Sequence, residues 1–286
     1  MREHEVPGSN AVGVVHHCSP GAEDEGVKPG MRVAAILQPG GANARYFSLP
    51  SSEVLPVGRH LDAADVACIS TAYLPAFQAL HHGRVRPYRY SRTCLEGRNI
   101  FIVGGDQLVA QATVRLAQLA GAKHVYISAP RCMVDPLQKI DAFVLDEDPC
   151  QWPDVMEGAM DVVIDYQFPK NFTEVKATVA RKGRLVCCAP THWKKEESLS
   201  WPDLTFQILQ LSLSIKRATF FDFRQNYKTS RYELKEDLQF LLTALTRRQI
   251  RPQIDKYVKL ADAPQVYREM KSKPTAGSII CEPWRE

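Results

Sequence analysis

The stretch that decides the fold runs from Arg98 to Ser128 and reads RNIFIVGGDQLVAQATVRLAQLAGAKHVYIS. Residues 100–103 form a continuous apolar run, which is typical of a parallel strand covered on both faces. Apolar residues then recur at helical spacing from Leu108 to Leu119. Gly121 follows where a glycine commonly ends a helix. The stretch therefore predicts a strand, a glycine turn, an amphipathic helix and a second strand, which together form one βαβ unit.

The turn between the strand and the helix contains Gly104 and Gly105. In a Rossmann unit this position binds the pyrophosphate of a dinucleotide, through free backbone N–H groups and the positive end of the helix dipole. Steps of three residues from Gly104 reach Gln107 and Ala110, where a full glycine fingerprint would have glycine. Ala110 is compatible with close helix packing, whereas Gln107 places a long amide where the ligand approaches. The unit is thus either a degenerate dinucleotide site or a Rossmann-like unit without a ligand. Its candidate contacts are Gly104, Gly105, Asp106, Gln107, Val109 and Ala110.

The composition is that of a globular protein that is neither membrane-spanning nor nucleic-acid-binding. Of 286 residues 45% are hydrophobic and 24% charged, and no apolar run is long enough to span a bilayer. The net charge is only +4, with basic residues scattered among the acids. The eight cysteines include the adjacent pair Cys187-Cys188 but no C-x-x-C pair, so we expect reduced thiols rather than disulfides or zinc ligands. The first ten residues contain no apolar signal region, which favours an intracellular, reducing compartment, cytoplasmic or organellar.

Other segments add strands and helices on both sides of the βαβ unit. Strands are expected at AVGVVHHCS (11–19), MRVAAILQ (31–38) and within ARYFSLPSSEVLPV (44–57), and a helical pattern runs from Asp62 to Leu80. Further along, AFVLD (142–146), MDVVIDYQF (160–168) and GRLVCCAP (183–190) are expected strands. NFTEVKATVARKG (171–183) and YELKEDLQFLLTALTRRQ (232–249) are expected amphipathic helices.

The order of these segments resembles the zinc-independent medium-chain dehydrogenase/reductases, namely quinone oxidoreductases and enoyl reductases. The likeness is carried by VPGSNAVGVV, GVKPGMRVAAI, GGANARYFSLP, the helix ending AFQAL, VARKGRLV and RRQIRPQIDKYVKLADAPQVYREMKSKPTAGSIIC. It implies an α/β fold with a doubly wound, parallel Rossmann sheet over 76–253. A partial GroES-like β domain over 1–75 would be completed by 254–286. It also implies a homodimer that pairs through the strand SIKRATFF (214–221).

Two departures from this family concern the β domain. The VPGS segment begins at Val6, whereas in the family it follows some tens of residues. The chain is therefore expected to be N-terminally shortened, or else its catalytic domain is reduced. Ser9 takes the place of the histidine that binds zinc in zinc-dependent relatives, and no cysteine-rich lobe follows. We therefore expect neither catalytic nor structural zinc.

Other departures concern the cofactor cleft that the resemblance implies. In an ungapped alignment Leu74–Leu80 correspond to the family's L-T-A-Y-Q-A-L, and Pro75 and Phe77 replace its threonine and tyrosine. A gapped alignment would use Thr71-Ala72-Tyr73 instead. Gln167-Phe168 replace a small, glycine-containing segment. The strand GRLVCCAP would end beside the nicotinamide, at Cys188 and Ala189. Its two cysteines alternate between the faces of the strand, which indicates core packing.

The strand HVYIS lacks a final acid for the ribose 2′-hydroxyl of NAD. Ser128 and Arg131 stand there, and an arginine can bind a 2′-phosphate, so any cofactor is expected to be NADP(H); a merely solvated arginine is the alternative. The first functional hypothesis is NADP(H)-dependent reduction of a quinone or an α,β-unsaturated carbonyl by hydride transfer, with Tyr73 and His81 as candidate proton donors. The second is a catalytically impaired pseudoenzyme without cofactor that serves as a structural or binding subunit of a larger assembly. A nucleotide sensor is the third.

Overall fold

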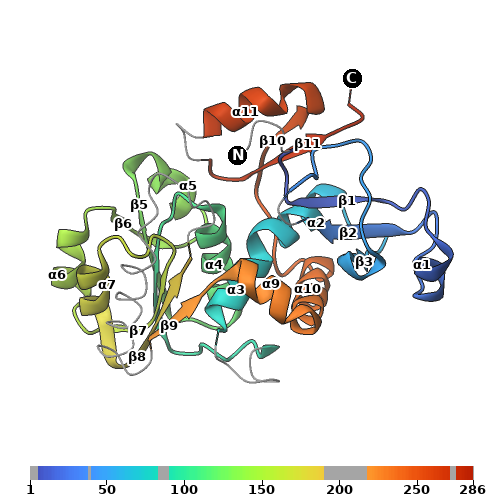
Figure 1. Ribbon diagram of the computed structural model, residues 1–286. Helices are drawn as coiled ribbons and strands as arrows, with labels where there is room; N and C mark the ends of the chain where they lie inside the picture. The colour runs from blue at the N-terminus through green and yellow to red at the C-terminus, as the bar shows by residue number, and fades with distance from the viewer. Residues whose placement is uncertain (1–5, 38–39, 83–89, 190–217, 271–274, 286) are drawn as a thin grey trace, which may run out of the picture. The chain divides into compact units, whose positions relative to one another are not determined.

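The computed structural model describes residues 6–37, 40–82, 90–189, 218–270 and 275–285 (Figure 1). The chain divides into two compact units. Unit 1 comprises Met1–Leu74 and Lys235–Glu286, and unit 2 comprises Pro75–Leu234. The first boundary lies next to the expected one, but residues 235–253, expected in the Rossmann domain, are assigned to unit 1. Within unit 1 the carbonyl of Arg251 accepts a hydrogen bond from the Tyr73 hydroxyl at 3.4 Å, which joins this segment to the N-terminal part.

The described residues of unit 2 form a six-stranded sheet in the order β6-β5-β4-β7-β8-β9, and every neighbouring pair is parallel. The first strand of this sheet in the sequence is the central strand β4. The chain then adds β5 and β6 on one side of β4, and returns to its other side with β7. This is the doubly wound arrangement expected from the sequence. The strands are β4 (Asn99–Val103), β5 (His124–Ala129), β6 (Phe143–Asp146), β7 (Met160–Asp165), β8 (Val179–Cys188) and β9 (Ala218–Phe221).

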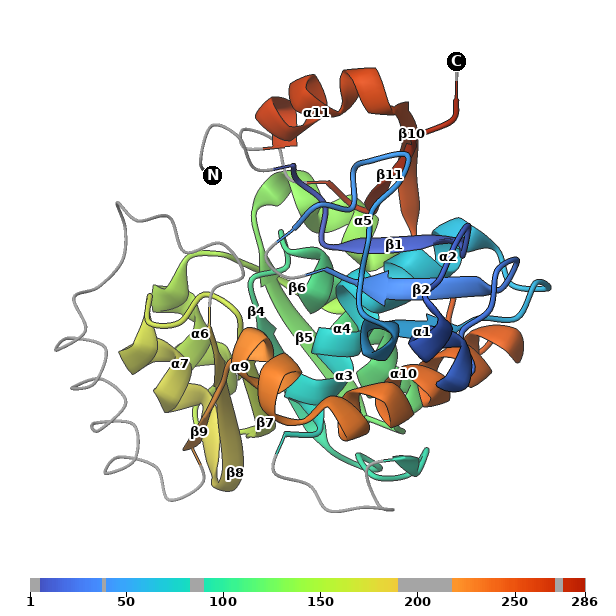
Figure 2. The ribbon, with the colours of Figure 1, turned by 45° about the vertical axis from the view of Figure 1, so that its right-hand side comes forward.

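Helices cover both faces of this sheet, with α6 and α7 on the face opposite α4 (Figures 1 and 2). The core under α6 and α7 contains Trp152 and Val175 packed on Phe101, Leu185 and other residues of the central strands. Gly121, at φ +85°, follows the last turn of α4 as expected. The helices are α3 (Leu74–Leu80), α4 (Leu108–Leu119), α5 (Val134–Gln138), α6 (Trp152–Met156), α7 (Phe172–Thr178) and α9 (Phe223–Thr229), with short 3₁₀ turns η4 (Arg131–Met133) and η5 (Pro149–Gln151).

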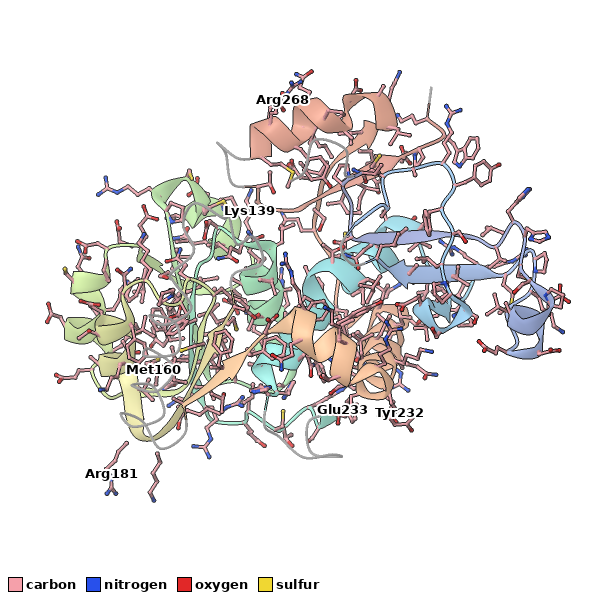
Figure 3. All side chains as sticks on the ribbon, in the orientation of Figure 1. Lys139, Met160, Arg181, Tyr232, Glu233 and Arg268 are labelled. Carbon is pink, nitrogen blue, oxygen red and sulfur yellow. The ribbon has the colours of Figure 1, made fainter. Side chains whose placement is uncertain are left out.

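The helix expected over 171–183 is shorter than predicted, because α7 ends at Thr178 and β8 begins at Val179. Val179 has an extended backbone and pairs with Met160 of β7. A Cβ at Gly183 would lie only 2.6 Å from the Met160 carbonyl oxygen, so glycine permits this close approach of β8 to β7. Arg181, between these contacts, is exposed and extends away from the sheet (Figure 3). Pairing with β7 thus overrides the helical pattern of VARKG.

Unit 1 contains a three-stranded antiparallel sheet in the order β1-β2-β3 and a parallel pair, β10-β11. Only a short part of 44–57 is a strand. The leucines of α10 at 234, 238, 241, 242 and 245 are buried, as its apolar periodicity predicts. The elements are β1 (Asn10–Val14), α1 (Pro20–Asp24), β2 (Arg32–Ile36), η1 (Ser51–Glu53), β3 (Val54–Pro56), α2 (Ala63–Cys68), the π-helical turn η2 (Ile69–Tyr73), α10 (Arg231–Thr246, which starts in unit 2), β10 (Ile254–Lys259), η6 (Leu260–Asp262), α11 (Ala263–Met270) and β11 (Ser278–Glu282).

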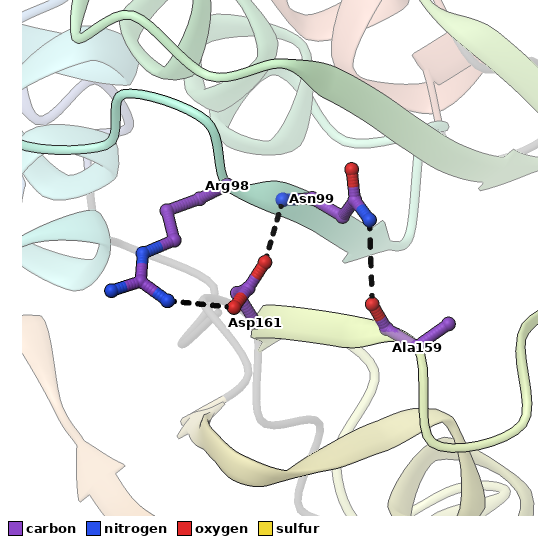
Figure 4. A network of polar contacts seen from close by, with 4 residues as sticks. All are labelled: Arg98, Asn99, Ala159 and Asp161. Atoms are coloured by element: carbon purple, nitrogen blue, oxygen red, sulfur yellow. Dashed lines mark hydrogen bonds and ion pairs between the residues drawn. The ribbon is translucent and has the colours of Figure 1, made fainter.

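A polar network joins the first residues of β4 and β7 (Figure 4). The Asp161 carboxylate accepts hydrogen bonds from the Arg98 guanidinium at 2.8 Å and from the Asn99 N–H at 3.0 Å. The Asn99 side-chain amide donates to the Ala159 carbonyl at 3.5 Å. These bonds align the amino ends of the two central strands. The carboxyl ends of the same strands, at the opposite edge, are therefore held in a defined register.

Within the described residues, none of the helices combines the length and apolar composition needed to cross a bilayer. Of the strand SIKRATFF, residues 214–217 lie outside the described part of the chain. The rest is β9, which ends the strand order of the sheet among the described residues. The homodimer expected from this strand stays a prediction.

Candidate functional site

The candidate site lies at the carboxyl edge of the unit 2 sheet, between β4 and β7. The chain leaves β4 toward β5 on one side of it and later returns to its other side with β7. Such a reversal of strand order is where open α/β sheets bind ligands. Val103 pairs with Ser128 on one side and with Asp165 on the other. Asp165 in turn pairs with Cys187. The register thus brings the glycine turn, Ser128 and the Cys187-Cys188 pair to one edge, as the sequence predicts for a cofactor site.

The two glycines of the turn are needed for different reasons. Gly104 has φ +100°, a conformation that L side chains rarely adopt. Gly105 donates its N–H to the Ser128 carbonyl at 2.8 Å, and a Cβ there would lie 2.9 Å from both the Ser128 oxygen and the Ala129 Cβ. The turn therefore keeps the backbone of a Rossmann phosphate site, followed by the N-terminus of the twelve-residue helix α4.

We expect Gly105→Ala to destabilise the protein by about 1–3 kcal/mol, because its methyl group would overpack the contact between the turn and β5. Gly13→Ala is the control, since a Cβ at Gly13 meets nothing within 4 Å and the residue has no left-handed backbone. The free energy of unfolding from urea denaturation measures both changes. Equal stability of the two variants would contradict the close packing of Gly105.

Two glutamine side chains cover Gly104. Gln107 donates its side-chain amide to the Tyr166 carbonyl at 3.0 Å. A Cβ at Gly104 would lie 3.2 Å from both the Gln107 Nε2 and the Gln167 Cγ. Gln107 is also the N-cap of α4, and its carbonyl accepts the first helical hydrogen bond, from Ala110. The amide expected to obstruct the ligand thus lies over the turn, bonded to the end of β7.

The polar groups beside this turn are both attractive and repulsive for an anion. The first N–H groups of α4 have no acceptors within their own helix. Gln111 donates its side-chain amide to the Gly105 carbonyl at 3.2 Å. The Asp106 Oδ1 is buried and has no hydrogen-bond partner among the described residues. A buried carboxylate oxygen at this position opposes the negative charge of a phosphate.

Asp165 is a buried carboxyl group at the switch point that sequence reasoning missed. It is 0% exposed, and its Oδ1 accepts the Gln167 N–H at 2.8 Å. Its Oδ2 has no hydrogen-bond partner among the described residues. Burial raises the pKa of Asp165 to about 7, against the opposing effect of hydrogen bonds from the Gln167 and Phe168 N–H groups. Asp165 therefore both holds the loop that follows β7 and titrates near neutral pH.

The Cys187-Cys188 pair is buried beside Asp165. Cys187 belongs to the core that contains Trp152 and Val175. Burial, followed by the nearby Asp165 carboxylate, raises the pKa of both thiols. Thiols that stay protonated are poor nucleophiles, which agrees with core packing. Ala189, next along the chain, donates its N–H to the Phe221 carbonyl at 2.8 Å and so joins the ends of β8 and β9.

Tyr166 links the loop after β7 to α4. Its hydroxyl is 2.7 Å from the Thr113 Oγ1, and both residues are buried. Burial, and secondarily the neighbouring Cys188, raises the pKa of Tyr166 well above its usual value. The phenol therefore stays protonated and structural. The carbonyl of this same residue binds Gln107, so the position of the glutamine over the turn depends on the contact between Tyr166 and Thr113.

Arg131 lies in η4, just after β5, and its side chain is 94% exposed. Its Nε is 3.6 Å from the Oδ2 of Asp146, the last residue of β6. Ser128, by contrast, is buried, and its carbonyl is used by Gly105. An acid therefore does stand near the predicted ribose position. It comes from the neighbouring strand β6, which is not contiguous in sequence with HVYIS.

The two candidate proton donors are both buried. The Tyr73 hydroxyl donates to the Arg251 carbonyl at 3.4 Å. His81 packs against Phe77 with ring centroids 4.5 Å apart, and its Nδ1 is 3.9 Å from the Cys94 Sγ. Either side chain would have to become exposed to a substrate before it could donate a proton.

The part of the chain that the structure describes contains no group of three or more His, Cys, Asp or Glu side chains arranged to hold a metal ion. Residues 141–281 nevertheless match the protein-family model described as zinc-binding dehydrogenase. The expected independence from zinc therefore stays a prediction, which elemental analysis of the purified protein would test.

The fold is shared with solved oxidoreductases. A probable oxidoreductase from Mycobacterium abscessus is 21% identical with a TM-score of 0.73, and the match covers 99% of this chain and 82% of that one. The JamJ enoyl reductase in its apo form is 16% identical with a TM-score of 0.78 and coverage of 98% and 79%. 2-Haloacrylate reductase is 19% identical with a TM-score of 0.76, and the match covers 98% of this chain and 84% of that one. Among curated proteins no sequence matched the chain significantly.

These findings confirm the resemblance and the fold class expected from the sequence. The match to the zinc-binding dehydrogenase model covers residues 141–281 of the 286-residue chain. The whole chain has the α/β fold of the medium-chain dehydrogenase/reductases, with a Rossmann sheet and a partial GroES-like β domain. The protein thus has an oxidoreductase-like fold, and part of its sequence resembles zinc-binding dehydrogenases.

Proposed function

We propose that this protein is a zinc-independent, NADP(H)-dependent reductase of a quinone or an α,β-unsaturated carbonyl. The observation that carries the proposal is the intact glycine turn at the switch point of the sheet, with Gly104 in a left-handed conformation and Gly105 packed against β5. The fold shared with solved reductases supports it. A nicotinamide cofactor would supply the hydride, and the chain's own residues would position it against the substrate.

The residues of the turn fit a dinucleotide if one side chain moves. The backbone N–H groups at the start of α4 would hold the pyrophosphate, and Arg131 would attract a 2′-phosphate. Gln107 has to leave the Tyr166 carbonyl or turn its amide toward the ligand. Breaking this hydrogen bond and leaving the carbonyl unpaired costs about 1–3 kcal/mol. Dinucleotide binding would then be weakened by about one to two orders of magnitude, but not abolished.

We expect Gln107→Gly to tighten NADPH binding by about 1–3 kcal/mol, because the amide no longer covers Gly104. Glycine is acceptable at an N-cap, so α4 should persist. Calorimetric titration with NADPH and NADH measures the change. Gln107→Ala removes the amide but keeps a Cβ, and Gln118→Ala is the matched control. Gln118 donates its amide to the Ile140 carbonyl at 2.8 Å, well away from the turn in the sequence.

The other results of this titration are equally informative. Weaker binding in Gln107→Gly would mean that the amide itself contacts the nucleotide, which keeps the reductase proposal but reverses the role of Gln107. No binding to the wild type or to either variant would contradict the reductase proposal for this chain.

A second candidate function is a pseudoenzyme that acts as a binding subunit. It is favoured by the two glutamines over Gly104 and by the burial of Tyr73 and His81. In unit 1, the exposed Tyr46 and Trp284 rings lie edge to face with centroids 5.5 Å apart. The Arg45 guanidinium lies 5.0 Å from the Trp284 ring centroid. Tyr, Trp and Arg are the residues enriched in protein interfaces. A folded, stable protein that binds neither NADPH nor NADH and shows no reductase activity would favour this function.

A further inference from the structure

Asp146 lies in the part of the edge where a nucleotide ribose is expected. It ends β6 and pairs with Ala129 of β5, so the ends of the two strands are level. Its carboxylate is 3.6 Å from the Arg131 guanidinium. Arg131 is the residue that favours a 2′-phosphate in the proposed function, on which this inference rests. The pair therefore places one positive and one negative group at the same point.

Asp146 is held more firmly than Arg131. Its Oδ1 accepts the Asp148 N–H at 3.1 Å, and its carbonyl accepts the indole N–H of Trp152 at 2.8 Å. Trp152 is itself fully buried in the core. The Asp146 side chain is 35% exposed, whereas that of Arg131 is 94% exposed. An ion pair this exposed contributes little stability, so Arg131 can turn to another anion at small cost.

We propose that Asp146 is a specificity-determining residue that opposes the 2′-phosphate and accepts the ribose 2′-hydroxyl of NAD(H). A 2′-phosphate brought to Arg131 meets a fixed carboxylate of the same sign within several ångströms. A 2′-hydroxyl is neutral and can donate a hydrogen bond to that carboxylate. Arg131 and Asp146 together thus give a smaller preference for NADPH than Arg131 alone would.

The test is the ratio of the NADPH and NADH affinities in the wild type and in three variants, measured by calorimetry. We expect Asp146→Asn to shift this ratio toward NADPH about five- to tenfold, from loss of a screened like charge. Arg131→Ala should shift it toward NADH. Asp141→Asn is the control with the same change in net charge. Asp141 is exposed and precedes β6 at its other end, and asparagine accepts its left-handed backbone.

The outcomes separate this inference from the proposed function. An unchanged ratio in Asp146→Asn, with both dinucleotides bound, would overturn the role of Asp146 and leave the reductase proposal intact. An equal shift in Asp141→Asn would also overturn it, because net charge alone would then explain the result. Failure of the wild type and of Asp146→Asn to bind either dinucleotide would overturn both. A shift that decreases as salt is added supports the inference.

Discussion

Asp165→Asn is expected to remove a large decrease in stability that the wild-type protein shows as the pH rises from about 4 to about 7. The physical reason is the burial of a carboxyl group whose Oδ2 has no hydrogen-bond donor among the described residues. In the unfolded chain an aspartate has a pKa of about 3.9. In the folded protein burial raises the pKa of Asp165 to about 7.

The sign follows from proton binding. Because the folded pKa is raised, the folded state binds more protons than the unfolded state between these two values. The associated stability is fully present below about pH 4 and is lost as the pH rises through about 7. At pH 8 the ionised group costs about 4 kcal/mol relative to its protonated form. Asparagine is neutral at every pH, and its side-chain oxygen can still accept the Gln167 N–H.

Urea denaturation at pH 4.5, 6 and 8 measures this effect. Asp165→Asn should be less stable than or similar to the wild type at pH 4.5, since burying its amide N–H₂ costs about 1–3 kcal/mol. Its stability relative to the wild type should then increase by several kcal/mol toward pH 8. Asp161→Asn, at the other end of β7, should lower stability at all three pH values, because it loses the ion pair with Arg98 and one of the two oxygens that accept from Arg98 and Asn99. A difference between Asp165→Asn and the wild type that does not change with pH would contradict the prediction.

Trp152→Ala is expected to destabilise the protein by about 3–5 kcal/mol, the usual cost of deleting a buried aromatic side chain. Trp152 is 1% exposed and lies edge to face against Phe101, with ring centroids 5.3 Å apart. The substitution would leave a cavity between α6 and the central strands. It would also remove the hydrogen bond from the indole N–H to the Asp146 carbonyl.

Trp152→Phe separates these two contributions, because it retains an aromatic ring but loses the hydrogen bond. We expect it to cost about 1–3 kcal/mol, mostly from the unpaired carbonyl. Tyr232→Ala is the control. Its side chain is 73% exposed, and such substitutions usually change stability by less than about 0.5 kcal/mol. Unfolding free energies from urea denaturation measure all three. If Trp152→Ala cost no more than Trp152→Phe, the core contribution of the indole would be refuted.

The elements that the sequence predicted well are those with a strong local signal. The apolar run before Gly104 and the helical spacing after Leu108 became β4 and α4 almost residue for residue. The prediction failed at Val179, where a continued helical pattern lost to pairing with β7. A strand was also expected within 44–57, where the structure has only the short strand β3 (Val54–Pro56). In both places the deciding contacts come from residues distant in the chain.

The candidate site divides in the same way. The sequence located the glycine turn and the long side chain of Gln107 beside it, because both follow from residue type at fixed spacing. It did not find Asp165 or Asp146, whose importance depends on which strands are neighbours. It also did not predict that Gln107 would bond the Tyr166 carbonyl, since nothing in the local sequence relates these two residues.

The sequence by itself therefore determined the βαβ unit, the family resemblance and the identity of the glycine turn, because backbone periodicity and glycine conformation are local properties. Only the tertiary structure decided the burial of Asp165, the pairing of Arg131 with Asp146, and the position of Gln107 over Gly104. The physical reason is that pKa values, ion pairs and coverage of a site depend on through-space neighbours. Strand order in the parallel sheet selects those neighbours from distant parts of the chain.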